Sequence, residues 1–213
     1  PHIKKYVESC GISSFKPAFP AVTCTAQAAY VTGKSPSDHG IVGNGWYDRD
    51  YSEVWFWKQS NKVVQGRKVW DELRDELPGF TVAKMCWWYN MYADVDYSCT
   101  PRPIYPADGR KFFDVHTQPM EMREQIKADL GEFPFPSFWG PRAGIDSSRW
   151  IADSALWIEE KQKPTLNLVY LPHLDYCLQK FGPDAPEIAG ELKAIDEIVG
   201  ELIEAFSKVG VKV

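Results

Sequence analysis

The segment 165–171 constrains the fold most, because it is an almost unbroken apolar run between two helical patterns. It reads TLNLVYL, and the helical pattern before it covers 148–161, with Ser147 or Ser148 as N-cap. The clearest helical pattern of the chain follows at 188–206. A strand that is apolar on both sides is typical of a parallel sheet with both faces covered. The chain is therefore expected to fold as an α/β protein.

Helical and strand patterns also alternate in the rest of the chain. Helical spacing occurs at 2–10 and at 69–77, and a strand pattern follows at 80–87. The first element is a helix, and a further strand pattern begins only at 211–213. We therefore expect residues 1–213 to form a single catalytic-domain portion. It would have a mostly parallel sheet with helices on both faces, incomplete at both ends.

The stretch 87–140 differs in character from its surroundings. It is rich in Trp, Tyr, Pro and Asp, and it has no clean periodicity. The sequence predicts an irregular, aromatic-rich insertion or cap. Either it brings side chains such as Tyr89, Asn90 and Arg102 to a ligand, or it is a surface excursion held by buried aromatic rings.

Composition and charge exclude several kinds of partner. The chain has 24 Lys and Arg residues against 29 Asp and Glu, a net charge of -5 and no basic cluster, so no nucleic-acid polymer is expected as a partner. No apolar run reaches transmembrane length, so no membrane segment is expected. The 5 cysteines are scattered without a C-x-x-C pair, which favours reduced thiols in a cytoplasmic protein. The sequence does not predict the oligomeric state.

The segment 20–44 holds the strongest chemical pattern. Thr23 stands just ahead of a small-residue helical run at 26–31, and a loop with His39 and Asn44 follows. The first amides of a helix have no partner within the helix and carry the positive end of its dipole. A phosphate bound there would face the Thr23 hydroxyl. The alternative is that Thr23 is only an N-cap.

This segment resembles the nucleotide pyrophosphatase/phosphodiesterase branch of the alkaline phosphatase superfamily. The positions that match that family's order and spacing are Pro20, Thr23, Val31-Thr32-Gly33, His39-Gly40-Ile41 and Asn44. The resemblance implies an alkaline-phosphatase-like α/β fold and a metal-dependent phosphoesterase with a phosphothreonine intermediate on Thr23. It also implies a small phosphorylated substrate and two divalent metal ions, with zinc as the first expectation.

A second chemical cluster follows the strand pattern at 165–171. Ligand sites of α/β sheets lie at the carboxyl ends of parallel strands, so this cluster should share an edge with Thr23. The resemblance places Asp175 on a metal-binding aspartate and Gln179 on a metal-binding histidine. Because an amide oxygen binds zinc more weakly than an imidazole does, the site would favour Mn or Mg, or recruit His173. A carboxylate directly after an apolar strand also needs a partner, and a metal is the expected one. The expected metal ligands are Asp175, Thr23, Gln179 and His173.

One position beside the nucleophile departs from the family pattern. Ala26 stands where the family usually has an asparagine that donates to the phosphate. Thr25 or Gln27 would replace that donor, or backbone amides alone would serve. The expected substrate-binding residues are Thr25, Gln27 and Asn44, and the identity of the substrate is not predicted.

Other functions stay open on the same residues. Phosphonate hydrolysis and a phosphomutase step are alternative reactions on this scaffold. Ala26 and Gln179 also allow a non-catalytic protein that only binds a phosphate ligand. Because the resemblance puts the remaining metal ligands outside 1–213, these residues by themselves are expected to be poorly active.

Overall fold

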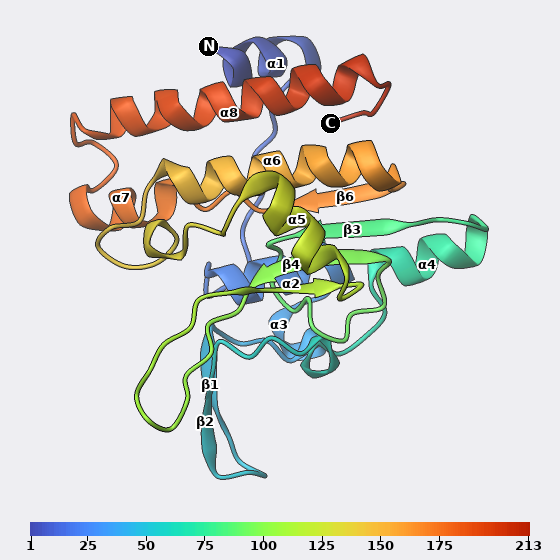
Figure 1. Ribbon diagram of the computed structural model, residues 1–213, viewed down its shortest axis with the longest axis vertical. Helices are drawn as coiled ribbons and strands as arrows, with labels where there is room; N and C mark the ends of the chain where they lie inside the picture. The colour runs from blue at the N-terminus through green and yellow to red at the C-terminus, as the bar shows by residue number, and fades with distance from the viewer.

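The computed structural model describes residues 1–213, in which helices and strands alternate along the chain (Figure 1). The helices are α1 (His2–Cys10), α2 (Thr23–Thr32), α3 (Pro36–His39), α4 (Val69–Glu76), α5 (Met122–Leu130), α6 (Ile145–Gln162), α7 (Leu174–Phe181) and α8 (Ile188–Lys208), with short 3₁₀ turns at Asn61–Val63 and Phe135–Ser137. The strands are β1 (Gly45–Asp48), β2 (Glu53–Phe56), β3 (Val82–Met85), β4 (Tyr97–Pro101), β5 (Val115–Gln118) and β6 (Leu166–Val169). Neither the long helices α6 and α8 nor any shorter one combines the length and the apolar character of a membrane-spanning segment.

The central sheet has the strand order β5-β4-β3-β6. β3 lies between β4 and β6 and is parallel to both, while β5 pairs with β4 in the antiparallel direction at the edge. β1 and β2 form a separate antiparallel hairpin that projects from the body of the molecule (Figure 1). The α/β fold with a mostly parallel sheet is confirmed, because β6, which lies within the strand predicted at 165–171, pairs in parallel with β3 along its whole length.

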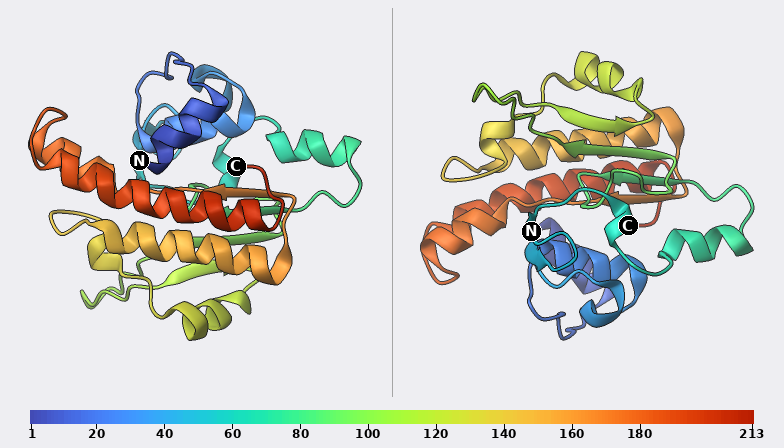
Figure 2. Two further views of the ribbon diagram at one scale, coloured as in Figure 1. Left: turned by 90° about the horizontal axis from the view of Figure 1, so that it is seen from above. Right: turned by 90° about the horizontal axis from the view of Figure 1, so that it is seen from below.

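Helices cover both faces of this sheet, as the sequence predicts. Side chains alternate along β3, so Ala83 and Met85 enter the core formed with α6 and α8. On the opposite face, Val82 packs with Val31 of α2 and Trp70 of α4. α6 and α8 run side by side over the first face (Figure 2).

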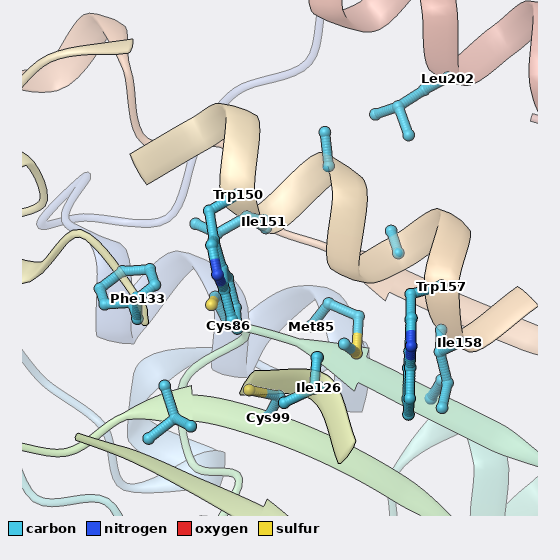
Figure 3. Packing of buried hydrophobic residues seen from close by; sticks show 14 of the residues in the cluster. Met85, Cys86, Cys99, Ile126, Phe133, Trp150, Ile151, Trp157, Ile158 and Leu202 are labelled. Atoms are coloured by element: carbon cyan, nitrogen blue, oxygen red, sulfur yellow. The ribbon is translucent and has the colours of Figure 1, made fainter. Parts of the chain in front are cut away.

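The main hydrophobic core lies between α6 and the sheet (Figure 3). Ile151 and Ile158 of α6 meet Met85 of β3 and Cys99 of β4 there, and these four side chains are fully buried. Burial of one such aliphatic side chain contributes roughly 1.5–3 kcal/mol, so this contact holds α6 on the sheet. The helix predicted at 148–161 thus packs its apolar face on the sheet.

The stretch 87–140 contains more regular structure than the sequence predicts. It supplies β4, β5 and α5, so half of the central sheet comes from it. The strands escape pattern recognition because they are short and carry polar residues inward: Ser98 and Thr100 of β4 and Thr117 of β5 are buried. Irregular chain remains between β4 and β5 and between α5 and α6.

Several element boundaries differ from the predicted ones. α6 begins three residues early, and Ser147 and Ser148 are buried in its first turn instead of capping it. β3 ends at Met85 because Cys86 has a left-handed backbone with φ of 58°. Residues 211–213 form no strand.

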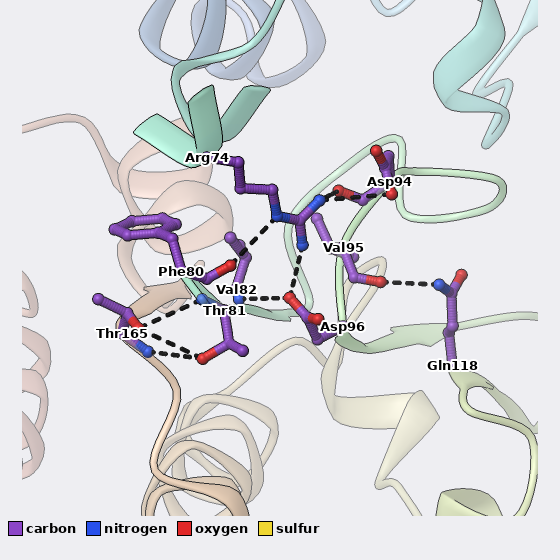
Figure 4. A network of polar contacts seen from close by, with 9 residues as sticks. All are labelled: Arg74, Phe80, Thr81, Val82, Asp94, Val95, Asp96, Gln118 and Thr165. Carbon is purple, nitrogen blue, oxygen red and sulfur yellow. Dashed lines mark hydrogen bonds and ion pairs between the residues drawn. The ribbon is translucent and has the colours of Figure 1, made fainter. Parts of the chain in front are cut away.

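A polar network fixes the amino ends of the parallel strands (Figure 4). Asp96 Oδ2 accepts hydrogen bonds from Arg74 Nη2 at 2.6 Å and from the Val82 N–H at 2.8 Å. The Thr165 N–H donates to Thr81 Oγ1 at 3.1 Å, and the Thr81 N–H donates to Thr165 Oγ1 at 3.2 Å. Because parallel strands run in the same direction, this alignment brings their carboxyl ends to one edge of the sheet.

Lys84 is fully buried in β3, on the face opposite the main core. Its Nζ donates to the carbonyl oxygens of Trp88 and Tyr89, each at 3.2 Å, and lies 5.1 Å from the centre of the Trp70 ring. Burial, with a smaller effect of the nearby Lys68 charge, lowers the pKa of Lys84 from 10.5 to about 7. The fold therefore moves the deprotonation of this lysine from alkaline pH to near neutral pH.

The stability of the protein should carry a pH dependence that comes from Lys84. The folded-state pKa is about 7 and the unfolded-state value is 10.5, so between these pH values the unfolded chain binds the extra proton and stability rises with pH. Urea unfolding at a series of pH values should show the wild type gaining stability relative to Lys84→Met as the pH rises from about 7 to about 10. Lys62→Met, at an exposed lysine, is the control and should run parallel to the wild type. A wild-type-minus-Lys84→Met difference that does not change with pH would contradict the lowered pKa.

Candidate functional site

A cavity of about 550 Å³ opens where β3 and β6 end and where α2 begins. Its lining consists of Ala21, Val22 and Thr23 at the start of α2, Asn44 and Trp57 at the base of the β1–β2 hairpin, Cys86 and Trp88 after β3, Phe138 and Trp139 before α6, and Tyr170, Pro172, Asp175, Tyr176 and Gln179 after β6. This is the edge at which α/β sheets place ligands. Thr23 and Asp175, which the sequence singles out from distant segments, line the same cavity.

Thr23 is the first residue of α2, and its side chain does not cap the helix. The N-cap is Val22, which has an extended backbone (φ -122°, ψ 160°) and no side-chain capping hydrogen bond. The helix therefore begins earlier than the predicted run at 26–31, and the N-cap alternative for Thr23 is not what the structure shows. Thr23 lines the cavity beside the first amides of α2, which are the helix end that attracts anions.

Asn44 connects the base of the hairpin to the start of α2. Its Oδ1 accepts a hydrogen bond from the Cys24 N–H at 2.9 Å, and its carbonyl oxygen accepts one from the Trp57 N–H at 3.0 Å. The side-chain amide nitrogen then remains as a donor on the cavity wall. The substrate-binding role of Asn44 stays a prediction, and the structure places the residue on the cavity wall.

Thr25 and Gln27 do not line the cavity, contrary to the sequence-based expectation. Thr25 is fully buried, and Gln27 Oε1 accepts a hydrogen bond from the Trp88 N–H at 2.7 Å. At about 100° per helical residue, Thr25 lies on the far side of α2 from Thr23, where it is buried. Gln27 lies one turn after Thr23 on nearly the same side, but its side chain is taken up by the bond to Trp88 instead of opening to the cavity. His39 is buried as well, where its Nδ1 accepts from the Ile41 N–H at 3.1 Å, and burial lowers its pKa.

Asp175 and Gln179 lie one turn apart on α7, and both reach the cavity. Asp175 follows the apolar strand but is exposed, so water can satisfy its carboxylate, and its position after the strand does not by itself require a metal partner. His173 is buried outside the cavity lining, and its Nε2 lies 2.7 Å from Glu191 Oε2 of α8. The structure thus brings Thr23 together with Asp175 and Gln179, and it directs His173 to a different neighbour.

Three tryptophans form one wall of the cavity, and the sequence does not predict this wall. The ring centres are 5.2 Å apart for Trp57 and Trp88, 5.8 Å for Trp57 and Trp139, and 6.2 Å for Trp88 and Trp139. The only sequence signal is aromatic enrichment, which does not tell a core ring from a cavity ring. A flat or apolar group has a contact surface here.

Asp175 is the only charged side chain that lines the cavity. Burial raises the pKa of Tyr170, while contact with the Thr23 hydroxyl lowers it by less, so the phenol stays protonated at neutral pH. Burial also raises the pKa of the Cys24 thiol, just behind Thr23, to about 12. The lining therefore holds no cationic side chain to neutralise a bound phosphate.

Known proteins resemble the whole chain. The family model described as type I phosphodiesterase / nucleotide pyrophosphatase matches residues 1–212. The uncharacterized pyrophosphatase/phosphodiesterase C725.05c of Schizosaccharomyces pombe is 27% identical over 198 residues, which are 90% of this chain and 33% of that protein.

Two solved structures of murine ectonucleotide pyrophosphatase / phosphodiesterase 5 have a similar fold. One is an inactive form in complex with AMP, with 16% identity, and the other has 17% identity; each has a TM-score of 0.57 and covers 92% of this chain and 44% of that one. The chain thus spans a third of the length of the curated relative and less than half of the solved chains. Because the family model covers nearly every residue, the chain belongs to the type I phosphodiesterase/nucleotide pyrophosphatase family.

Proposed function

We propose that the protein is a metal-dependent phosphoesterase of the phosphodiesterase/pyrophosphatase type, with Thr23 as its nucleophile. The observation that carries this proposal is the position of Thr23. It stands at the start of α2, its hydroxyl is not used to cap the helix, and it lines the same cavity as Asp175. Family membership supports the class of reaction. The covalent intermediate is a phosphothreonine.

The proposed reaction has two displacements at phosphorus. Thr23 Oγ forms a bond to phosphorus, the bond to the leaving oxygen breaks, and the leaving alcohol takes up a proton. Water then attacks phosphorus, the bond to Thr23 Oγ breaks, and the threonine hydroxyl regains a proton. The net reaction adds one water across the ester, so neither a redox partner nor a second substrate is required.

The start of α2 and Asn44 would hold the phosphoryl oxygens. The first amides of α2 present the positive end of the helix dipole to the cavity. The Asn44 amide nitrogen adds a side-chain donor, and the hydrogen bond from Cys24 N–H to Asn44 Oδ1 fixes its direction. Ala26 does not weaken this arrangement, because the donors come from the backbone and from the loop.

The organic part of the substrate would lie against the tryptophan wall. The murine relative was solved with AMP, a phosphate ester that carries a flat aromatic base. We propose a small phosphate ester of this general kind, since Trp57, Trp88 and Trp139 offer it an apolar surface beside Thr23.

The donor atoms in the cavity fit a divalent cation that prefers oxygen. Asp175 supplies a carboxylate, Gln179 an amide oxygen and Thr23 a hydroxyl, whereas the imidazole of His173 is at Glu191. A bound divalent ion would offset the phosphate charge and favour ionisation of the threonine hydroxyl. Asp175, Gln179 and Thr23 are the residues of this chain that would hold it, and Mn or Mg suits these donors better than zinc does.

Thr23→Ala separates the enzyme from a protein that only binds phosphate ligands. Removal of the nucleophile should lower hydrolysis of bis(p-nitrophenyl) phosphate by at least about a thousandfold, because Thr23 is the only serine or threonine in the cavity lining. Steady-state assays of the complete protein with added Mn, Mg or Zn measure this loss. Binding of a product phosphate ester, followed by calorimetry, should change much less.

Thr32→Ala is the matched control, since Thr32 ends the same helix and its Oγ1 donates to the Ala28 carbonyl at 2.7 Å. It should keep the wild-type rate. Turnover that survives Thr23→Ala would rule out Thr23 as the nucleophile. A wild type without turnover but with ligand affinity would favour the binding protein.

Gln179→His tests the proposed metal preference. An imidazole one turn after Asp175 adds a strong zinc ligand, so zinc affinity should rise by about tenfold or more. Competition with a chromophoric zinc chelator gives this affinity independently of activity. Gln179→Asn keeps an amide and should show no gain, and His173→Gln should leave zinc affinity unchanged. If Gln179→His does not bind zinc more tightly than the wild type, the metal is held by other residues. Weaker zinc binding in His173→Gln would show that His173 is one of them.

A further inference from the structure

We propose that the β1–β2 hairpin extends the cavity wall outward and binds an apolar chain on the alcohol of the substrate. The binding surface is the hairpin strip, which consists of the exposed side chains of Phe56, Val54 and Tyr47 on one face of the hairpin. This inference rests on the proposed phosphoesterase function and names a substrate class for it. The class is a phosphate ester whose alcohol carries an uncharged apolar chain that reaches beyond the cavity.

The register of the hairpin brings the strip together. Gly45 pairs with Phe56, and Tyr47 pairs with Val54. Directly paired residues of an antiparallel pair, and residues two apart in one strand, point to the same face. Phe56, Val54 and Tyr47 therefore lie side by side, and they are 63%, 67% and 59% exposed. A contiguous exposed apolar surface of this kind is typical of a binding site.

The Phe56 ring joins the strip to the cavity wall. It lies where a side chain at position 45 would be, because a methyl group on Gly45 would come within 2.5 Å of Phe56 Cδ2. Its centre is 5.4 Å from the centre of the Trp57 ring. Trp57 and Asn44, which are the chain neighbours of Phe56 and Gly45, both line the cavity. The strip thus begins where the tryptophan wall ends.

The two faces of the hairpin differ in character. On the face opposite the strip, the Trp46 and Trp55 rings are 5.9 Å apart, and Trp46 also packs against a buried cluster of the body. The same face carries the pair of Asp48 and Glu53. The strip has no charged side chain and no core residue over it. It therefore offers a contact surface to an apolar group, and it offers no ionic partner to a charged one.

The position of the strip fits an alcohol that leaves the cavity past Trp57. With the phosphoryl group at Thr23, the alcohol would follow the tryptophan wall to Phe56. Two residues of a strand span about 7 Å, so Val54 and Tyr47 extend the apolar surface by that length beyond Phe56. The hairpin projects from the body of the molecule, so the strip is open to a chain that leaves the cavity (Figure 1).

A comparison of two diester probes tests the strip. In the complete protein with added divalent metal, kcat/KM for octyl p-nitrophenyl phosphate should exceed that for methyl p-nitrophenyl phosphate by at least about tenfold, since each methylene group that leaves water favours binding. Tyr47→Thr/Val54→Thr should reduce this ratio to about threefold or less. Threonine keeps the strand preference of a β-branched residue, so the hairpin should remain folded.

Glu53→Thr is the matched control. Glu53 directly precedes Val54 in β2 and points to the opposite face, and its ion pair with Lys58 is exposed. The ratio of the two probes should stay at the wild-type value. Because the ratio is taken within each variant, a general change in activity does not affect it.

A binding measurement keeps the proposal testable if the double variant is poorly folded. Val54→Thr alone changes one methyl group to a hydroxyl and leaves the volume nearly unchanged. Calorimetry of octyl phosphate against methyl phosphate gives the same preference without turnover, and Val54→Thr should lower it relative to Glu53→Thr. An octyl preference that is the same in Val54→Thr, in the double variant and in the wild type would contradict the strip.

The outcomes distinguish this inference from the proposed function. Equal hydrolysis of the two probes by the wild type would overturn the strip and leave the role of Thr23 standing. Octyl phosphate binding that depends on Val54, without turnover of either probe, would overturn the proposed function and leave the strip standing. A dimer in sedimentation velocity that Tyr47→Thr/Val54→Thr dissociates would show that a second copy covers the strip, which would contradict substrate binding there.

Discussion

The parallel pairing of β3 with β6 is the constraint on which the site depends. Thr81 and Thr165 lock the two strands at their amino ends, and Asp96 holds the start of β3 to α4 through Arg74. Since both strands run in the same direction, the residues that follow them arrive together at the opposite edge. Tyr170 and Cys86, which directly follow the strands, thereby line one cavity with the start of α2. Contacts at the amino ends of β3 and β6 thus determine which residues meet in the cavity at their carboxyl ends.

The sequence predicts the parts of this structure that depend on long, regular patterns. The helices at the two ends, the strand at 165–171 and the pairing of Thr23 with Asp175 across one sheet edge follow from apolar periodicity and from topology. Short polar strands do not follow, because β4 and β5 bury serine and threonine where a pattern search expects apolar residues. The surroundings of α2 were equally hidden: Thr25 is buried on one side of the helix and Gln27 is held by the Trp88 N–H on another, and no local pattern reveals these neighbours. Histidine is a common metal ligand, which is why the sequence suggests His173. In the structure its imidazole lies against Glu191 of α8, a neighbour that no local sequence pattern reveals.

The charge of the cavity lining gives a physical reason for proposing a metal ion. A phosphate ester is anionic at neutral pH, and the lining adds Asp175 without any cationic side chain. Helix amides and Asn44 provide partial positive charge, which is less than a bound phosphate and a carboxylate together require. A divalent cation between Asp175 and the phosphate would resolve this imbalance. In the proposed site, Gln179 in place of an imidazole would change which cation is favoured, without removing the charge that a cation would offset.

The loop after β3 shows how buried polar groups support the aromatic wall. Cys86, Tyr89 and Tyr92 all have left-handed backbones, with φ of 57° to 58°, which costs on the order of 1–2 kcal/mol for each such residue. Lys84 offsets this cost by donating to the carbonyl oxygens of Trp88 and Tyr89 from beneath. From the side, Gln27 accepts the Trp88 N–H. Trp88 is therefore held by its backbone on two sides before any ligand arrives, so the cavity wall loses little conformational freedom on binding. The inward turn of Gln27 and the burial of Lys84 thus serve the site indirectly, by fixing the surface against which a substrate would lie.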